Sequence, residues 1–195
     1  NTRFQETDFK AGIGYSNAKF SSVLRYNYNN LDLGIPEDGI ADQTTNKKTA
    51  YPSQGVFNNL ISLNNVVYFQ NSKLDVNLGY INNDRSEFED SDIPVLHMVL
   101  NTFNYNVKYY LPQLGKLETI VGVQGMNQSN KNFGEEYLIP DAITNDFGVF
   151  GTGIYAWENN SLQAGLRYDY RNLNTEENGI QGEEGYFQPI DKSYN

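Results

Sequence analysis

The chain has 195 residues, of which 38% are hydrophobic and 14% aromatic, and its net charge is -10 at pH 7. Its Lys and Arg residues form no basic patch, which excludes nucleic-acid binding as a function. The chain contains no Cys, which excludes disulfide bonds and thiol chemistry.

Eight extended segments are predicted along the chain. In six of them apolar or aromatic residues alternate with polar ones, which gives a strand one apolar face and one polar face. In chain order these six are residues 8–15, 19–28, 73–80, 99–109, 117–124 and 162–171. Two further segments, near 57–69 and 146–157, look extended but have no clean division into two faces. Each clean segment spans about ten residues, the length that a tilted strand needs to cross a bilayer.

The connections between these segments alternate between short and long. The short ones are residues 16–17, 70–73, 112–116 and 158–160, and the long ones are 30–56, 84–96, 127–145 and everything after 172. The long stretches contain 17 of the 24 acidic residues and five of the 14 basic ones, a net charge of -12. Tight turns at one end and long loops at the other are typical of a transmembrane β-barrel, which needs no long apolar run.

We therefore predict an all-β, antiparallel, up-and-down transmembrane β-barrel segment of about eight strands, with tight periplasmic turns and long extracellular loops. A complete bacterial barrel begins and ends in the periplasm, so its first connection is a long outer loop. Here the first connection is a tight turn, which predicts that residues 1–195 are a slice from a larger barrel. The stretch after 172 is expected to be loop-like and to supply no closing strand, which puts both ends of the chain on the long-loop side.

Three stretches carry a family resemblance. They are Asn132-Phe133-Gly134-Glu135-Glu136-Tyr137-Leu138-Ile139-Pro140-Asp141, then Phe147-Gly148-Val149-Phe150, then Gly165-Leu166-Arg167-Tyr168-Asp169. Together with residues 79–88, they resemble the barrel of TonB-dependent outer-membrane receptors, in the Asn-, Tyr- and Gly-rich style of Bacteroidetes-type bacteria. The resemblance covers nearly the whole chain, at about eight of the 22 strands of such a barrel.

The resemblance implies a function for the complete protein. Such receptors take up bulky nutrients such as ferric siderophores, haem, cobalamin or glycans, with a ferric siderophore as our first expectation. The implied partners are outer-membrane lipid and lipopolysaccharide, a plug domain with the rest of the barrel, and the TonB complex. The plug and its TonB-binding box are not found in this sequence, so the chain is expected to contribute wall and loops only.

Two groups of residues are candidates for the functional surface. Arg25, Arg167, Asp169 and Arg171 fall on the polar face of strands, which in a large barrel faces the wet lumen. We interpret them chiefly as an Arg–Asp–Arg ladder that braces the wall or the plug. Arg85 and Tyr137 fall in outer loops and are the candidates for substrate contact, since a guanidinium and an aromatic face suit chelates and sugars.

Catalysis and metal binding are not expected. His97 is the only histidine, and the sequence places no nucleophile or carboxylate beside it. Acidic residues crowd positions 84–92 and form pairs at 135–136, 176–177 and 183–184, but the regular spacing of a calcium loop is missing. We therefore predict neither an enzyme nor a cofactor or metal site.

Two other classes of protein remain open from the sequence. A complete eight-stranded barrel with a structural or adhesive role would have the same strand number. A soluble β-sandwich, either a lectin-like binding module or a β-rich hydrolase, would cover the apolar faces with a second sheet.

Overall fold

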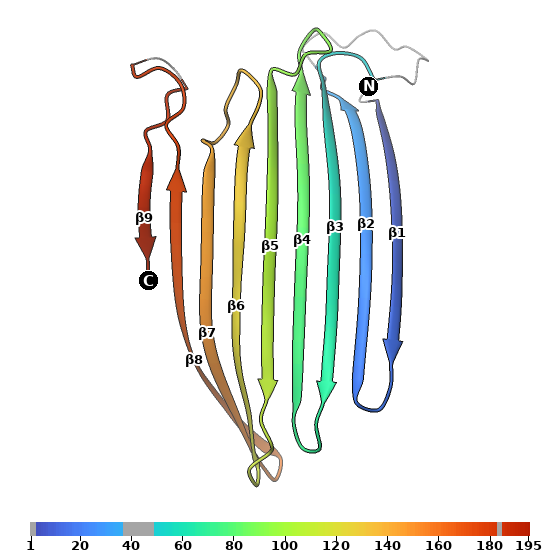
Figure 1. Ribbon diagram of the computed structural model, residues 1–195, viewed down its shortest axis with the longest axis vertical. Coiled ribbons are helices and arrows are strands. Elements are labelled where there is room, and N and C mark those ends of the chain that lie inside the picture. Colours follow the sequence, from blue (N-terminus) through green and yellow to red (C-terminus); the bar gives the residue numbers. More distant parts are fainter. Residues whose placement is uncertain (1–2, 37–48, 183–184) are drawn as a thin grey trace.

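The computed structural model describes residues 3–36, 49–182 and 185–195. Within them the chain forms one antiparallel sheet of nine strands, in which neighbours in the sequence are also neighbours in space (Figure 1). The strands are β1 Phe4–Ser16, β2 Phe20–Gly34, β3 Ser53–Tyr68, β4 Lys73–Phe88, β5 Leu96–Tyr110, β6 Leu117–Asn132, β7 Ala142–Trp157, β8 Asn160–Thr175 and β9 Ile190–Tyr194. No helix of the described residues is long and apolar enough to cross a membrane.

The all-β, antiparallel, up-and-down prediction is confirmed, and the structure adds a strand to it. All eight predicted segments are strands, and the tail beyond residue 172 also contains β9, which pairs with β8 from Arg171↔Tyr194 to Thr175↔Ile190. The expectation of a wholly loop-like tail is therefore wrong. The first described residues lie at the long-loop end, but β9 runs back along β8 and leaves the C-terminus at mid-height (Figure 1).

The strands are longer than the alternation predicted. Seven of the nine have 15 or 16 residues, so the connections at the long-loop end shrink to residues 35–52, 89–95, 133–141 and 176–189. Most of the extra length lies at that end, where the alternation breaks, because apolar residues such as Leu31, Val56 and Met98 lie on the face that is polar in the middle of the sheet. Backbone ladder hydrogen bonds do not depend on side-chain polarity, so the strands continue where the sequence signal stops.

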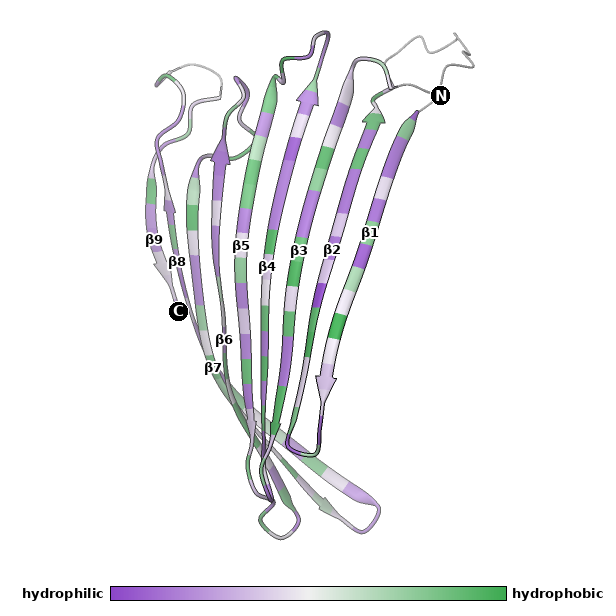
Figure 2. Ribbon diagram, turned by 45° about the vertical axis from the view of Figure 1, so that its right-hand side comes forward, coloured by the Kyte–Doolittle hydropathy of each residue, from purple (hydrophilic) through white to green (hydrophobic). Residues whose placement is uncertain are grey.

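The register defines two faces, because directly paired residues lie on the same side of a sheet. One face, here called the apolar face, contains the row Ile13, Leu24, Leu63, Leu78, Tyr105, Gly125 and Phe147, each paired with the next. The opposite face, here called the polar face, contains Arg25, Asn77 and Arg167. Figure 2 shows the resulting alternation of hydrophobic and hydrophilic residues along the strands.

The sheet has almost no hydrophobic core. Leu96 and Met98 are the buried hydrophobic residues of the described chain, whereas Ile13 is 73% and Leu166 87% exposed on the apolar face. The sheet is also open, since β1 and β9 lie at opposite edges and each strand contacts only its neighbours. Closure into a barrel is therefore not observed.

The buried residues gather at the long-loop end, where loop 133–141 folds over the start of β5. The amide of Phe133 donates to the carbonyl of His97, and the amide of Glu136 donates to the carbonyl of Val95, both at 2.8 Å. Gly134 makes this approach possible, since a Cβ there would lie 2.5 Å from the Val95 carbonyl oxygen. The loop thus covers Leu96 and Met98 and forms a packed rim.

Candidate functional site

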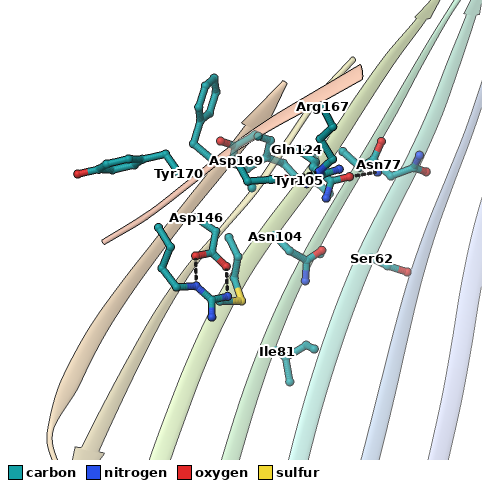
Figure 3. A pocket seen from close by; sticks show the side chains of 18 of the residues that line it. Ser62, Asn77, Ile81, Asn104, Tyr105, Gln124, Asp146, Arg167, Asp169 and Tyr170 are labelled. Carbon is teal, nitrogen blue, oxygen red and sulfur yellow. Dashed lines mark hydrogen bonds and ion pairs between the residues drawn. The ribbon is translucent and has the colours of Figure 1, made fainter. Parts of the chain in front are cut away.

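A hollow of about 830 Å³ lies on the polar face, at the level of the middle of the strands. Its side chains come from β3 to β8, and Tyr194 of β9 borders it (Figure 3). Nine of the residues from these strands have amide or charged side chains, and the others include Leu60, Leu78, Ile81, Tyr105, Met126, Phe147 and Tyr170, so the lining of the hollow is both polar and apolar. A volume of this size is typical of small-molecule sites.

A row of amide side chains forms the floor of the hollow. Asn64, Asn77, Asn106 and Gln124 are paired directly across four successive strands. In one half of the row every link is bonded: Arg25 Nη1 donates to Asn64 Oδ1 at 2.5 Å, and Asn64 donates to Asn77. In the other half the bond from Asn106 Nδ2 to Gln124 Oε1 is long, at 3.5 Å, and the buried Oδ1 of Asn106 has no partner among the described residues.

Two Arg–Asp pairs form the side of the hollow at β7 and β8. The Nε and Nη2 atoms of Arg171 each donate to one oxygen of Asp146, both at 2.6 Å. Arg167 binds Asp169 in the same forked way, with Nε 2.6 Å from Oδ2. Both pairs have the bidentate geometry that gives a carboxylate its strongest hydrogen bonds.

Gly148 provides the space for the second pair. It lies on β7 directly opposite Asp169, and a Cβ at this position would overlap Asp169 Oδ1 and lie 2.8 Å from Arg167 Nη2. Gly79 has the same role beneath Asn104, whose Oδ1 would lie 2.6 Å from a Cβ. Side chains of the hollow therefore lean across glycines of the neighbouring strand.

The structure places Arg25, Arg167, Asp169 and Arg171 on the same face, and the last three line the hollow. The predicted Arg–Asp–Arg ladder is not the arrangement found, because Asp169 binds Arg167 while Arg171 binds Asp146. Asp146 was missed because residues 146–157 show no clean alternation. Only the cross-strand register, which pairs Asp146 with Arg171, reveals it.

Arg85 and Tyr137 lie outside the hollow. Arg85 belongs to β4 rather than to a loop. With the Gln54 amide turned so that its oxygen faces Arg85, Nε and Nη2 lie 2.9 and 2.6 Å from that oxygen. Tyr137 is half-buried in loop 133–141. The two residues are thus part of the rim at the long-loop end.

His97 has a carboxylate beside it that sequence reasoning missed. Its Nε2 lies 3.0 Å from Asp84 Oδ1, and the ring of Phe133 lies 5.2 Å away. Asp84 is one diagonal step from His97 across β4 and β5, so only the register brings them together. No group of three or more His, Asp or Glu residues within the described chain is placed to hold a metal ion.

Asp141 fastens the two C-terminal long loops to the sheet. Its carboxylate accepts hydrogen bonds at 2.8 Å from the backbone and side chain of Asn132, and Lys131 lies 3.1 Å away. Its amide donates to Asn178, and its carbonyl accepts from Glu176. Burial raises the pKa of Asp141, but the hydrogen bonds from Asn132 and Lys131 outweigh burial and hold this pKa below its usual value.

Comparison with known proteins adds no family to this description. No protein-family model matches the chain, and no curated protein matches it. Three features of the chain bear on its function: the exposed apolar face, the hollow on the polar face, and the packed rim.

Proposed function

We propose that the chain forms part of the wall and the outer loops of an outer-membrane β-barrel. We further propose that the complete protein is a TonB-dependent receptor for uptake of a bulky nutrient, with a ferric siderophore as that nutrient. The wall assignment is supported by the apolar face. The assignment to TonB-dependent uptake is supported only by the resemblance of residues 79–88, 132–141, 147–150 and 165–169.

The observation that carries the wall assignment is a continuous apolar band across eight strands. On the apolar face, every second residue is mostly apolar, aromatic or Gly within 9–15, 20–28, 61–67, 74–80, 103–109, 117–125, 147–157 and 162–170. Ser22, Asn65 and Thr119 are polar exceptions. The band measures about 20 Å along β4 and about 27 Å along β8. At a barrel strand tilt of about 35–45° these lengths correspond to heights of about 14–16 Å and 19–22 Å, somewhat below the roughly 25 Å of a barrel's lipid-facing band.

The band ends in a polar row on the side of the long loops. The first polar residues above the band are Thr7, Asn30, Asn59, Asn82, Asn101, Asn127, Asn145 and Asn172. Several bond to one another: Asn82 donates to Asn101 at 3.0 Å and Asn127 to Asn145 at 2.6 Å. Tyr80 also donates to Asn101, at 2.7 Å, and so joins an aromatic ring below the row to the amides within it. Tyrosines at the edge of an apolar band are typical of a membrane interface.

Both margins of the band shift in the same direction across the sheet. Asn101 is paired with Ser129, so the polar row drops by two residues to reach Asn127 on β6. At the turn end, Tyr109 is paired with Val121, and the band continues four residues further to Leu117. Strands that tilt through a layer of constant thickness produce this shift, and barrel strands tilt by about 35–45°.

The two other classes gain no support from the described residues. A soluble sandwich would place a second sheet over the apolar face, but the described residues contain a single sheet. A closed eight-stranded barrel would pair β8 with β1, whereas β8 pairs with β7 and β9.

The absence of natural Cys allows a direct test of the wall assignment. Ser91→Cys lies in a long loop and Asn159→Cys in a tight turn at the opposite end of the sheet. In intact cells we expect a membrane-impermeant maleimide to label Ser91→Cys alone, and both variants after the outer membrane is broken. Equal labelling in intact cells, or recovery of the protein in the soluble fraction, would refute the assignment.

The uptake assignment needs a separate test in cells. A strain that lacks the gene should fail to grow under iron limitation on one ferric siderophore and should recover when the complete gene is restored. Recovery should also require the TonB complex. If the deletion strain grows normally on every siderophore but poorly on haem, cobalamin or a glycan, the imported nutrient is that compound and not a siderophore.

A further inference from the structure

We propose that the hollow binds an uncharged ligand rich in hydroxyl and amide groups, and that it discriminates against anions. This inference rests on the proposed function in one respect, since it takes the ligand to be the imported nutrient. It narrows the nutrient to uncharged compounds and proposes that the nutrient contacts side chains of the barrel wall.

The charge of the hollow favours an uncharged ligand. Two guanidinium groups and two carboxylates line it, and each Arg is bound to one Asp in a forked pair. Arg25, just beyond the lining, is joined through Asn64 and Asn77 to Asp75 at the other end of the same chain of hydrogen bonds. An anionic chelate binds most tightly to cationic groups whose charge is not already balanced by a neighbouring anion. In the hollow each Arg is already paired with an Asp, so an anion gains little there.

The hydrogen-bonding groups of the hollow match hydroxyl and amide groups. Each Asn or Gln side chain presents both a donor and an acceptor, which is what a hydroxyl or amide group of a ligand requires. Six such side chains line the hollow, namely Asn64, Asn77, Asn104, Asn106, Gln124 and Asn195.

The unbonded half of the amide row locates the ligand. The buried Oδ1 of Asn106 lacks a donor, and its Nδ2 makes only the 3.5 Å contact with Gln124. A buried acceptor without a donor costs free energy. Asn106 lines the hollow, and a turn of its side chain toward the hollow would let a hydroxyl or N–H group of a ligand recover that cost. The ligand is therefore expected between Asn106 and the Arg167–Asp169 pair, above Gln124 and Gly148.

Two kinds of nutrient share this chemistry. One is an oligosaccharide, and the other is an uncharged ferric chelate such as a complex with a cyclic trihydroxamate peptide. A ferric tris-catecholate has the same metal but carries three negative charges. These three probes therefore separate charge from metal and from sugar.

Binding can be measured on the full chain, folded in detergent micelles at low ionic strength. The probes are a glucose heptasaccharide, the uncharged ferric trihydroxamate and the ferric tris-catecholate, followed by calorimetry. We expect one uncharged probe to bind at least tenfold more tightly than the tris-catecholate, and the identity of that probe distinguishes sugar from chelate. Tighter binding of the tris-catecholate, or binding of neither uncharged probe, overturns the inference.

A charge variant gives a second, independent readout. Asp169→Asn leaves Arg167 uncompensated and should strengthen binding of the trianionic probe about tenfold, as three unit charges at a separation of about 8 Å in water require. Asp146→Asn should act in the same direction through Arg171. Asp8→Asn is the matched control, because Asp8 lies on the same face outside the hollow and should have no effect. An equal effect of Asp8→Asn and Asp169→Asn contradicts a local site.

The failure of this inference and that of the proposed function can be told apart. Labelling of Ser91→Cys and Asn159→Cys reports on the membrane alone, and the detergent assay reports on the hollow alone. A chain that lies in the outer membrane but prefers the tris-catecholate refutes only the charge inference. A soluble chain that prefers an uncharged probe refutes only the membrane assignment.

Discussion

Leu166→Lys tests the apolar band at its centre. Leu166 is 87% exposed, and it lies on β8 midway between Leu162 and Tyr170, which mark the two edges of the band. In water, replacing so exposed a Leu changes the free energy of unfolding by less than about 0.5 kcal/mol. If lipid covers this face, the Leu166 side chain is buried in hydrocarbon, and the substitution removes nearly all of the roughly 2 kcal/mol that burying a Leu side chain contributes. A Lys at the bilayer midplane costs about 2–4 kcal/mol in total.

The assay is urea unfolding of the full chain from phospholipid vesicles, followed by tryptophan fluorescence. The loss in the free energy of unfolding should depend on the depth of the residue in the membrane. We expect a loss of about 2–4 kcal/mol for Leu166→Lys and of about 0–1 kcal/mol for Leu162→Lys, which lies nearer the interface. Gln163→Lys is the control, since it adds the same charge on the polar face. A folded Leu166→Lys protein with unchanged stability would show that lipid does not cover this face.

Three further predictions concern the rim and the hollow. Asp141→Ala removes the acceptor of three hydrogen bonds and should lower the free energy of unfolding by about 2–4 kcal/mol. The control Glu176→Gln weakens only an exposed ion pair and should cost less than about 1 kcal/mol. Thermal unfolding of the two variants measures this difference. Because the pKa of Asp141 is lowered in the folded chain, its contribution is complete above the unfolded pKa of 3.8 and is lost as the pH falls through the lower folded value. The backbone amide of Asn132 should therefore titrate below pH 3.8 in nuclear magnetic resonance spectra, and a midpoint near pH 5 would contradict this. Gly148→Ala should displace the Arg167–Asp169 pair and lower the free energy of unfolding by about 1–3 kcal/mol. In the control Gly151→Ala, the new methyl group meets no atom closer than 3.9 Å, so the stability should not change. Equal melting temperatures of the two variants would contradict the close packing at Gly148.

The strands were predictable where one face is apolar and the other polar. In 162–171 the period of two is clear because Leu162, Leu166 and Tyr170 share a face and nothing apolar competes with them on the other. In β3 the signal fails, since Leu60 lies on the polar face and Asn65 on the apolar face. Strand ends were missed for a different reason: near the long loops, apolar residues such as Leu31 and Met98 lie on the otherwise polar face, so the alternation breaks while backbone pairing continues.

The hollow could be predicted only in part. Alternation assigns Arg167, Asp169 and Arg171 to one face but gives no partner for any of them. The partner of Arg171 follows from the pairing of residue 146 with residue 171, and that pairing depends on the length of the turn after Trp157. The contact between His97 and Asp84 likewise depends on register, which a list of alternating residues does not contain.

The order of the strands has a consequence for how such a chain can change in length during evolution. Every strand pairs only with the strands before and after it in the sequence. Duplication or deletion of two consecutive strands with their turn would leave all other pairs antiparallel and would keep each apolar face on its own side. Loss of a single strand would reverse the direction of everything that follows and exchange the turn end for the loop end. Hairpins are therefore the units in which this sheet can grow or shrink.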